Sequence, residues 1–204
     1  KADTLRGSIT PERAWWNLLH YNLQLRPDIR QKTLQGNVEI RFRAVRAGRF
    51  MQVDLQQPLI IDSVTFAVSA TKTRLLAFKR DSNVAIIDYG KILLSGKESA
   101  IRIYYHGTPR EAVRPPWDGG VSWKKDADGA PFVAISCQGL GASSWWPCKD
   151  HQADVPDAGM LISIRVPDTL TAVSNGRLKK QMQHADRTRT WVWEVKSPIN
   201  NYGV

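Results

Sequence analysis

The chain has 204 residues, 42% of them hydrophobic, and 29 basic against 19 acidic side chains give it a net charge of +10. This composition excludes extensive disorder, and no apolar run approaches the ~20 residues that span a bilayer, so we expect no membrane span. The basic residues are spread along the chain rather than clustered among aromatic ones, which indicates a solvated surface and no nucleic-acid partner.

The chain opens with a short helical turn and continues almost entirely in strands. Thr10 suits the N-cap position and Pro11 the first turn of the helix. Apolar and polar residues then alternate over residues 20–26 and 33–45, the pattern of a strand with one buried face, and Gly36 indicates a bulge in the second strand. Further strands are expected at residues 50–55, 60–68, 73–79, 84–88 and 99–106.

Residues 110–129 interrupt this pattern. Their prolines, glycines and aspartates predict a long irregular excursion, and long ordered loops are often functional. Strands resume at residues 131–137, 159–166, 170–174, 177–183 and 188–195, with a hairpin expected at Asn175-Gly176. About a dozen short strands and almost no helical period predict an all-β fold, a saddle-like sandwich of two sheets with mostly antiparallel strands.

The most specific stretch runs from Cys137 to Asp150 and reads CQGLGASSWWPCKD. Gln138 supplies an amide, and Gly139 and Gly141 allow positive φ and close approach of the backbone. The two tryptophans that follow supply large rigid apolar faces. Such a segment either lines a site or forms a corner of the β core.

Two further features of this stretch bear on chemistry. Cys137 and Cys148 either form a disulfide or are two buried free thiols, because two cysteines alone cannot build a four-ligand zinc site. His151 follows Asp150 and lies near Ser143, but adjacency in sequence does not create the geometry of a hydrolase triad, and no G-x-S-x-G motif is present.

Five stretches occur in an order and spacing that resemble a known family. They are ITPERAWWNLLHYNLQLRPD, TLQGNVEIRFRA, PPWDGGVSW, CQGLGASSWWPCKD and TAVSNGRL. Together they resemble the amino-terminal domain of the aminopeptidase N family of zinc metallopeptidases, and the bacterial branch most closely. The resemblance covers nearly the whole chain and implies a single β domain over residues 1–204, with the catalytic domain of the same polypeptide following it.

Full-length members of this family remove amino-terminal residues from peptides with a zinc ion held by an H-E-x-x-H helix and a downstream glutamate. None of the four histidines here, at positions 20, 106, 151 and 184, is followed by Glu or paired at i+4. The resemblance therefore implies no catalytic residue, metal ligand or cofactor in this chain. Zinc is expected in the parent enzyme, and the chain alone should be inactive.

One family role has a matching residue. In the family, a Gln or Glu ahead of the aromatic-Pro-Cys motif holds the free α-amino group of the peptide substrate, and Gln138 occupies that position. An amide oxygen can accept a hydrogen bond from an ammonium group, and Gly139 and Gly141 would let the backbone approach the ligand. Gln138, Gly139 and part of the Arg114–Trp123 loop are expected on the surface that meets the catalytic domain. The alternative that Gln138 only bonds a neighbouring strand stays open.

One departure from the family, one alternative function and the location of the protein remain to be considered. The family's proline after the Pro-Cys-x-Asp motif is displaced here to Pro156, which leaves the conformation of this loop and the role of His151 open. The eight tryptophans would also suit a stand-alone carbohydrate-binding module, which requires several exposed, coplanar rings. The charge and the absence of an initial Met favour a bacterial periplasmic or envelope location, although family members occur on both sides of the membrane.

Overall fold

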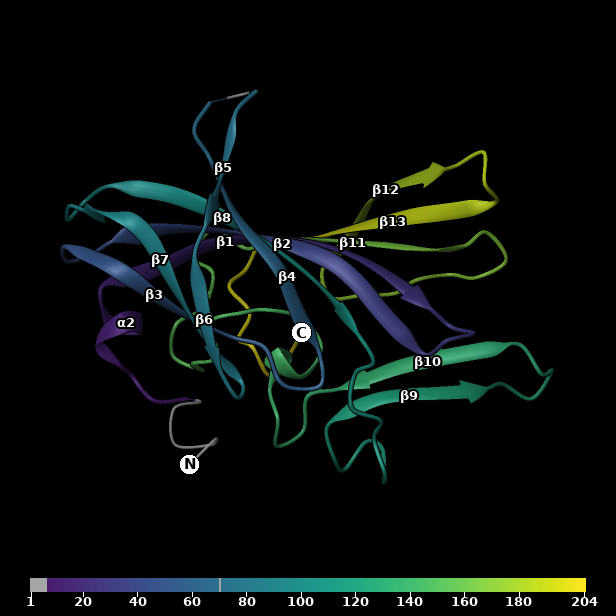
Figure 1. Cartoon of the computed structure of the whole chain (residues 1–204). Coiled ribbons are helices and arrows are strands. Elements are labelled where there is room, and N and C mark those ends of the chain that lie inside the picture. The colour runs from purple at the N-terminus through teal and green to yellow at the C-terminus, as the bar shows by residue number, and fades with distance from the viewer. Residues whose placement is uncertain (1–6, 70) are drawn as a thin grey trace.

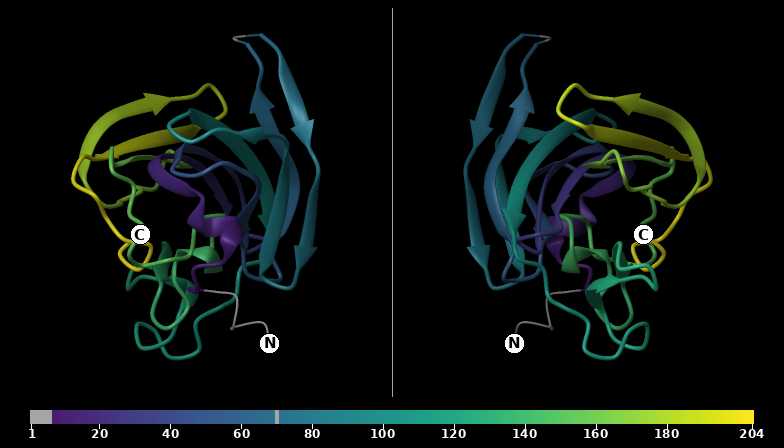
Figure 2. Two further views of the ribbon diagram at one scale, coloured as in Figure 1. Left: turned by 90° about the vertical axis from the view of Figure 1, so that its left-hand side faces the viewer. Right: turned by 90° about the vertical axis from the view of Figure 1, so that its right-hand side faces the viewer.

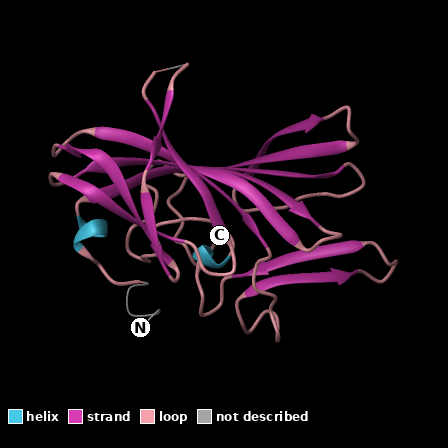
Figure 3. Cartoon of the chain, in the orientation of Figure 1, coloured by secondary structure: helices cyan, strands magenta, loops and turns pink. Residues whose placement is uncertain are grey.

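Strands carry nearly all of the regular structure in the computed structural model of the chain, which describes residues 7–69 and 71–204 (Figure 3). In these ranges, eight strands form a large sheet in the order β12-β13-β11-β1-β2-β8-β4-β5, three form a second sheet, β3-β7-β6, and β9 and β10 form a ribbon (Figure 1). Neighbouring strands are antiparallel, apart from β1 and β11 among the described pairs. The prediction of an all-β sandwich of mostly antiparallel strands is confirmed.

The large sheet consists of β1 (Trp16–Asp28), β2 (Thr33–Ala44), β4 (Ile60–Ala67), β5 (Thr73–Leu76), β8 (Glu98–Gly107), β11 (Met160–Pro167), β12 (Arg177–Gln183) and β13 (Thr188–Val195). The second sheet consists of β3 (Gly48–Asp54), β6 (Phe78–Asp81) and β7 (Val84–Leu93), and the ribbon of β9 (Gly120–Lys125) and β10 (Pro131–Ser136). The predicted helical turn is α2 (Pro11–Ala14). Thr10 stands at its N-cap, but its hydroxyl donates to Gln52 Oε1 at 2.7 Å instead of capping the helix.

The main hydrophobic core lies between the two sheets, and a small second cluster is formed by Val166, Ala172 and Trp191. Alternate residues of β1 and β2 point into the main core, as the sequence pattern predicts, and Phe42 is fully buried. The ring of Phe42 packs edge-on against Trp15, Trp16 and Tyr89 with centroids 5.7, 5.7 and 6.2 Å away, an arrangement that aromatic rings favour. Figure 2 shows the large sheet curving over the rest of the chain, with the loops that follow β8 and β10 on its concave side.

The single strand predicted for residues 73–79 is wrong, because the chain changes sheets within it. β5 pairs with β4 in the large sheet, whereas β6 pairs with β7 in the second sheet. Leu76 and Phe78 therefore pack into the core from two different sheets. Alternation of apolar residues continues through such a corner, so the pattern alone cannot locate it.

The bulge predicted at Gly36 is also wrong. The register between β1 and β2 runs without interruption through Gly36, and the irregularity lies in β1 between Leu18 and His20. A Cβ on Gly36 would lie 2.3 Å from the backbone oxygen of Gln24 and 3.2 Å from the Tyr105 ring. Glycine is needed here because neighbouring groups approach closely.

Residues 170–174 do not form the predicted strand, and Asn175-Gly176 does not form a hairpin. The hairpin at this end of the chain instead joins β12 to β13 through residues 184–187. Gly176 has φ +88°, and a Cβ there would lie 2.2 Å from the backbone oxygen of Glu194. Asn175 donates from Nδ2 to the Gly203 oxygen at 2.8 Å. The dipeptide therefore packs against β13 and the segment that follows it, and it does not form a turn between paired strands.

The excursion predicted over residues 110–129 is irregular over residues 110–119 and in the turn of residues 126–130, but it contains a strand between them. β9 occupies residues 120–125 and pairs along its whole length with β10.

The described residues include no helix with the length and hydrophobicity that crossing a membrane requires.

Candidate functional site

Gln138 lies on an exposed turn directly after β10. The turn is closed by the backbone N–H groups of Leu140 and Gly141, which both donate to the Cys137 oxygen at 3.0 and 2.8 Å. Gly139 adopts φ +69°, and a Cβ there would meet no atom within 4 Å. Glycine is therefore favoured at this position because the backbone is left-handed, not because space is short. The turn presents the Gln138 side chain to solvent.

The loop of residues 110–119 packs beside this turn. Ser136 Oγ donates to the Pro116 oxygen at 3.1 Å, and a Cβ on Gly119 would lie 2.7 Å from the backbone oxygen of Gln138. The loop is braced by the Asp118 carboxylate, which accepts from the backbone N–H groups of Val113 and Arg114 at 2.8 and 2.7 Å. These two bonds, that to Val113 foremost, lower the pKa of Asp118.

The surface around Gln138 is partly apolar. Trp117 is 82% exposed and Val113 is 78% exposed, and both belong to the loop that touches the Gln138 turn. The structure thus brings together Gln138, Gly139 and part of the Arg114–Trp123 loop, the set that the sequence places on one surface. Exposed aromatic and aliphatic side chains next to an exposed amide are typical of a surface that another domain covers.

Tyr202 is a member of this site that the sequence pattern missed. Its hydroxyl donates to Oε1 of Gln138, across a separation of 64 positions. The tyrosine is held by a turn in which Asn200 Oδ1 accepts from the backbone N–H groups of Tyr202 and Gly203 at 3.1 and 3.0 Å. No local motif marks such a pair, because the contact depends on the path of the segment that follows β13.

Gly141 does not join the exposed part of the site. It is buried with φ +78°, and a Cβ on it would lie 2.8 Å from Oδ1 of Asp150. The residue therefore makes room for a buried carboxylate, while Gln138 and Gly139 face solvent.

A buried ion cluster underlies the site and is formed by Arg13, Asp54, Asp150, Ser143 and Asn201. Arg13 Nη2 lies 2.5 Å from Asp54 Oδ2, which also accepts from the backbone N–H of Asp150 at 3.0 Å. The Asp150 carboxylate accepts from the Ser143 hydroxyl and from the Asn201 amide nitrogen. Burial raises the pKa of Asp54, and the guanidinium of Arg13 acts in the opposite direction. The cluster ties α2, β3 and the Cys137–Asp150 stretch to the segment that carries Tyr202.

The loop after Cys148 is closed by a second buried cation. Lys149 Nζ donates to the Trp16 oxygen at 2.6 Å and to Asp154, and it lies 4.0 Å from the centroid of the Trp16 ring. Burial lowers the pKa of Lys149, and Asp154 opposes this effect. His151 contacts the Gly7 oxygen through Nδ1 at 2.8 Å. Ser143, the serine near His151 in the sequence, donates its hydroxyl to the Asp150 carboxylate instead, so Ser143 and His151 do not form a nucleophile-and-base pair.

The described residues do not fit a zinc site. No group of three or more His, Cys, Asp or Glu side chains in residues 7–69 and 71–204 could hold a metal ion. Three of the histidines have other partners: His106 contacts Asp62 at 2.6 Å, His184 contacts Thr190 at 2.8 Å, and His151 contacts a backbone oxygen.

Both cysteines are buried free thiols in the structure. Cys137 Sγ donates to the Val204 oxygen at 2.8 Å, and burial raises its pKa to about 11. Cys148 is fully buried, and burial raises its pKa as well.

We expect both thiols to be unreactive in the folded protein at pH 8, because a thiol with a pKa of about 11 is protonated there and the thiolate is the nucleophile. Titration with a thiol-specific disulfide reagent should detect almost no thiol before unfolding, and about two per chain after unfolding in denaturant without reductant. If no thiol appeared after unfolding, the two cysteines would be disulfide-bonded instead.

The tryptophans do not form the surface that a carbohydrate-binding module needs. Five of the eight are buried, namely Trp15, Trp16, Trp145, Trp146 and Trp191. Two more, Trp123 and Trp193, are half-buried against the core. Among the described residues only Trp117 is strongly exposed, so no row of exposed coplanar rings is present.

Comparison with known proteins places this geometry in a family. The family model of the peptidase M1 N-terminal domain matches residues 17–202. Among curated proteins, no sequence matches this chain.

Solved structures share the fold. A two-domain M1 zinc metallopeptidase variant bound to L-tryptophan is 19% identical with a TM-score of 0.74, over 94% of this chain and 42% of that chain. An M1 zinc metallopeptidase from Deinococcus radiodurans is 20% identical with a TM-score of 0.73, over 92% and 40%. A two-domain variant bound to L-arginine is 18% identical with a TM-score of 0.74, over 99% and 44%.

The chain thus spans less than half the length of these solved relatives. The family match covers nearly all of its strands, from β1 to the turn that carries Tyr202. The chain therefore belongs to the peptidase M1 N-terminal domain family.

Proposed function

We propose that this chain is the non-catalytic amino-terminal domain of a zinc-dependent aminopeptidase, that it borders the substrate cleft, and that Gln138 accepts a hydrogen bond from the free α-amino group of the peptide. The observation that carries the proposal is the exposed amide of Gln138 on a braced turn, next to an apolar surface and to Tyr202. Gly139 allows the turn, and with it the position of the amide. Gly141 is buried, so its position does not support the expectation that its backbone approaches the ligand.

The contact with Tyr202 supports this role for Gln138. A carbonyl oxygen has two lone pairs, and the tyrosine hydroxyl occupies one of them at Oε1. The hydrogen bond holds the Gln138 amide in one orientation. The second lone pair of Oε1 can then accept a hydrogen bond from a substrate ammonium group. Such a hydrogen bond would define where the first residue of the peptide lies.

The parent enzyme would supply the metal and the chemistry. The solved relatives are M1 zinc metallopeptidases, two of them two-domain proteins, and this chain covers 40–44% of each. The partner would be a catalytic domain of the same polypeptide, whose zinc would polarise the scissile carbonyl and activate water. The bacterial branch and the envelope location stay predictions from the sequence.

The test compares the full-length protein that carries this domain with the 204-residue chain, using hydrolysis of aminoacyl-anilides and measurement of bound zinc. The full-length protein should hold about one zinc ion per chain and hydrolyse substrates with a free α-amino group but not N-acetylated ones. The 204-residue chain, with folding verified by circular dichroism, should do neither. Stoichiometric zinc or turnover in the folded 204-residue chain would contradict the proposal.

A further inference from the structure

One strand edge of the β9–β10 ribbon is unpaired in the described part of the chain. β9 pairs with β10 on one side and contacts Glu111 through Val121 on the other. Within residues 7–69 and 71–204, β10 pairs with β9 alone, so the N–H and C=O groups of alternate residues point away from the ribbon. A free edge of this kind is a template for another extended chain.

A groove of about 510 Å³ runs along this edge. β10 lines it with five consecutive residues, 131–135, and residues 170–175 line another part of it. Residues 171–175 form no backbone–backbone hydrogen bond with any described residue. The Ala172 oxygen accepts from Trp193 Nε1 at 3.0 Å, whereas the other peptide groups of residues 171–175 and the free edge of β10 can pair with a strand that lies in the groove.

The walls of the groove are apolar. The buried side chains of Leu34 and Trp145 line its floor together with Ile164. At its rim, Phe132 is 55% exposed and Val173 is 74% exposed. An extended peptide presents every second side chain to the same side, so a segment with apolar residues at alternate positions would bury them here.

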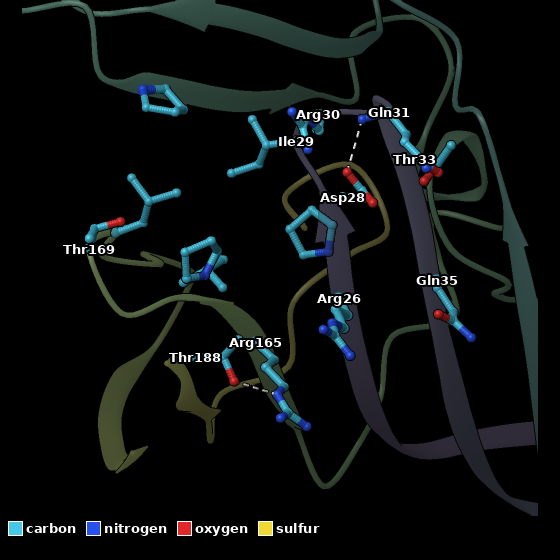
Figure 4. A pocket seen from close by; sticks show the side chains of 15 residues that line it. Arg26, Asp28, Ile29, Arg30, Gln31, Thr33, Gln35, Arg165, Thr169 and Thr188 are labelled. Atoms are coloured by element: carbon cyan, nitrogen blue, oxygen red, sulfur yellow. Dashed lines mark hydrogen bonds between the residues drawn. The ribbon is translucent and has the colours of Figure 1, made fainter. Parts of the chain in front are cut away.

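At one end the groove continues into a second pocket of about 630 Å³, with which it shares lining residues that include Pro27, Pro131 and Leu170. Arginine side chains surround this pocket, and Figure 4 shows Arg26 near Arg165 at one end and Arg30 at the other.

The charge of this second pocket is positive. Arg165 is already bonded to Asp186 at 2.8 Å and to Thr188 at 2.8 Å. Arg26 and Arg30 form no ion pair with the described residues, and Asp28 is the one carboxylate among the residues lining the pocket. Two exposed guanidinium groups at the end of an apolar groove are complementary to carboxylates on an entering chain.

We propose that this groove binds an extended peptide segment of a partner protein, added as a strand to the free edge of β10, with apolar side chains at alternate positions and acidic residues beside Arg26 and Arg30. Backbone pairing supplies affinity, and the arginines select charge and direction. Gln138 is not among the lining residues of either pocket, but its hydrogen-bond partner Tyr202 lines the groove. The two roles are therefore distinguished by their variants, because Arg26 and Arg30 lie outside the Gln138 site and test the peptide groove alone.

The test measures binding of fluorescein-labelled, end-blocked octapeptides to the full-length protein by fluorescence anisotropy. The first peptide alternates valine and threonine and carries two glutamates at one end. A second carries lysines in place of the glutamates, and a third carries N-methyl groups on alternate residues, which prevents pairing with a strand edge. The glutamate peptide should bind, and the other two should bind at least about tenfold more weakly.

Variants locate the site. The double variant Arg26→Ala with Arg30→Ala should weaken binding of the glutamate peptide by roughly tenfold. The matched control is Arg177→Ala, because Arg177 is an exposed arginine on β12 outside both pockets, and it should leave binding unchanged.

Four results would overturn the proposal. The first is equal binding of the N-methylated peptide, and the second is absence of binding by every peptide. The third is complete displacement of the peptide by inorganic polyphosphate, with polyphosphate itself bound to the arginines. The fourth is a dimer in sedimentation that Phe132→Ser dissociates, which would identify a second copy as the occupant of the groove.

Discussion

Asp54→Ala should lower the free energy of unfolding by about 3–5 kcal/mol, because it removes one partner of a buried ion pair. The side chains of Arg13 and Asp54 are each 1% exposed and lie 2.5 Å apart. Asp54 also accepts from the backbone N–H of Asp150, and its own backbone pairs with Cys148 in both directions at 2.8 and 3.0 Å. The substitution would leave the Arg13 charge in the core without its carboxylate and would loosen the segment that leads to Gln138.

Two variants separate the charge effect from general damage to the fold. Asp54→Asn keeps the shape and an acceptor oxygen but not the charge, so it should destabilise the protein less than Asp54→Ala. Asp88→Ala removes the partner of Arg49 on an exposed surface, where the ion pair is screened by water, and should change stability little. Urea denaturation followed by tryptophan fluorescence gives the three values. If Asp54→Ala and Asp88→Ala had equal effects, the buried pair would not be a main support of the fold.

The strands that the sequence predicts best are those with one buried and one solvated face. β1 and β2 alternate clearly because the residues on their polar side are partly or fully exposed along both strands. The prediction fails at the corner between β5 and β6, where both sides of the turn remain apolar. It also fails at Gly36 and Gly176, because what each glycine accommodates is a backbone oxygen far away in sequence, that of Gln24 and that of Glu194.

The candidate site also contains residues that the sequence can predict and residues that it cannot. Gln138 and Gly139 belong to a local motif, so a resemblance to a family is enough to single them out. Tyr202 meets Gln138 only through the fold, and nothing near it in sequence indicates the contact. The buried ion cluster is equally hidden, since Arg13 and Asp54 are 41 positions apart and each resembles an ordinary surface charge in the sequence.

In the aminopeptidase that we propose carries this domain, Gln138→Ala should lower kcat/KM for peptides with a free α-amino group by about 10- to 150-fold. A hydrogen bond to a charged group contributes about 1.5–3 kcal/mol, and each 1.4 kcal/mol corresponds to a factor of about ten. Gln138→Glu should retain most of the activity, because a carboxylate also accepts from an ammonium group. Tyr202→Phe should have a smaller effect, since it leaves the amide in place and removes only the bond that orients it.

The matched control for this series is Gln181→Ala, a change of an exposed glutamine on β12, which should leave both kinetic constants as they are. A role in holding the α-amino group requires that the loss for Gln138→Ala disappear with substrates whose first residue lacks that group, measured as slow residual hydrolysis. If Gln138→Ala lowered the rates of free and desamino substrates by the same factor, the residue would act on the position of the domain rather than on the substrate. The proposed contact would then be wrong even though the chain still belonged to its family, because family membership rests on the whole β domain and the contact on one exposed amide.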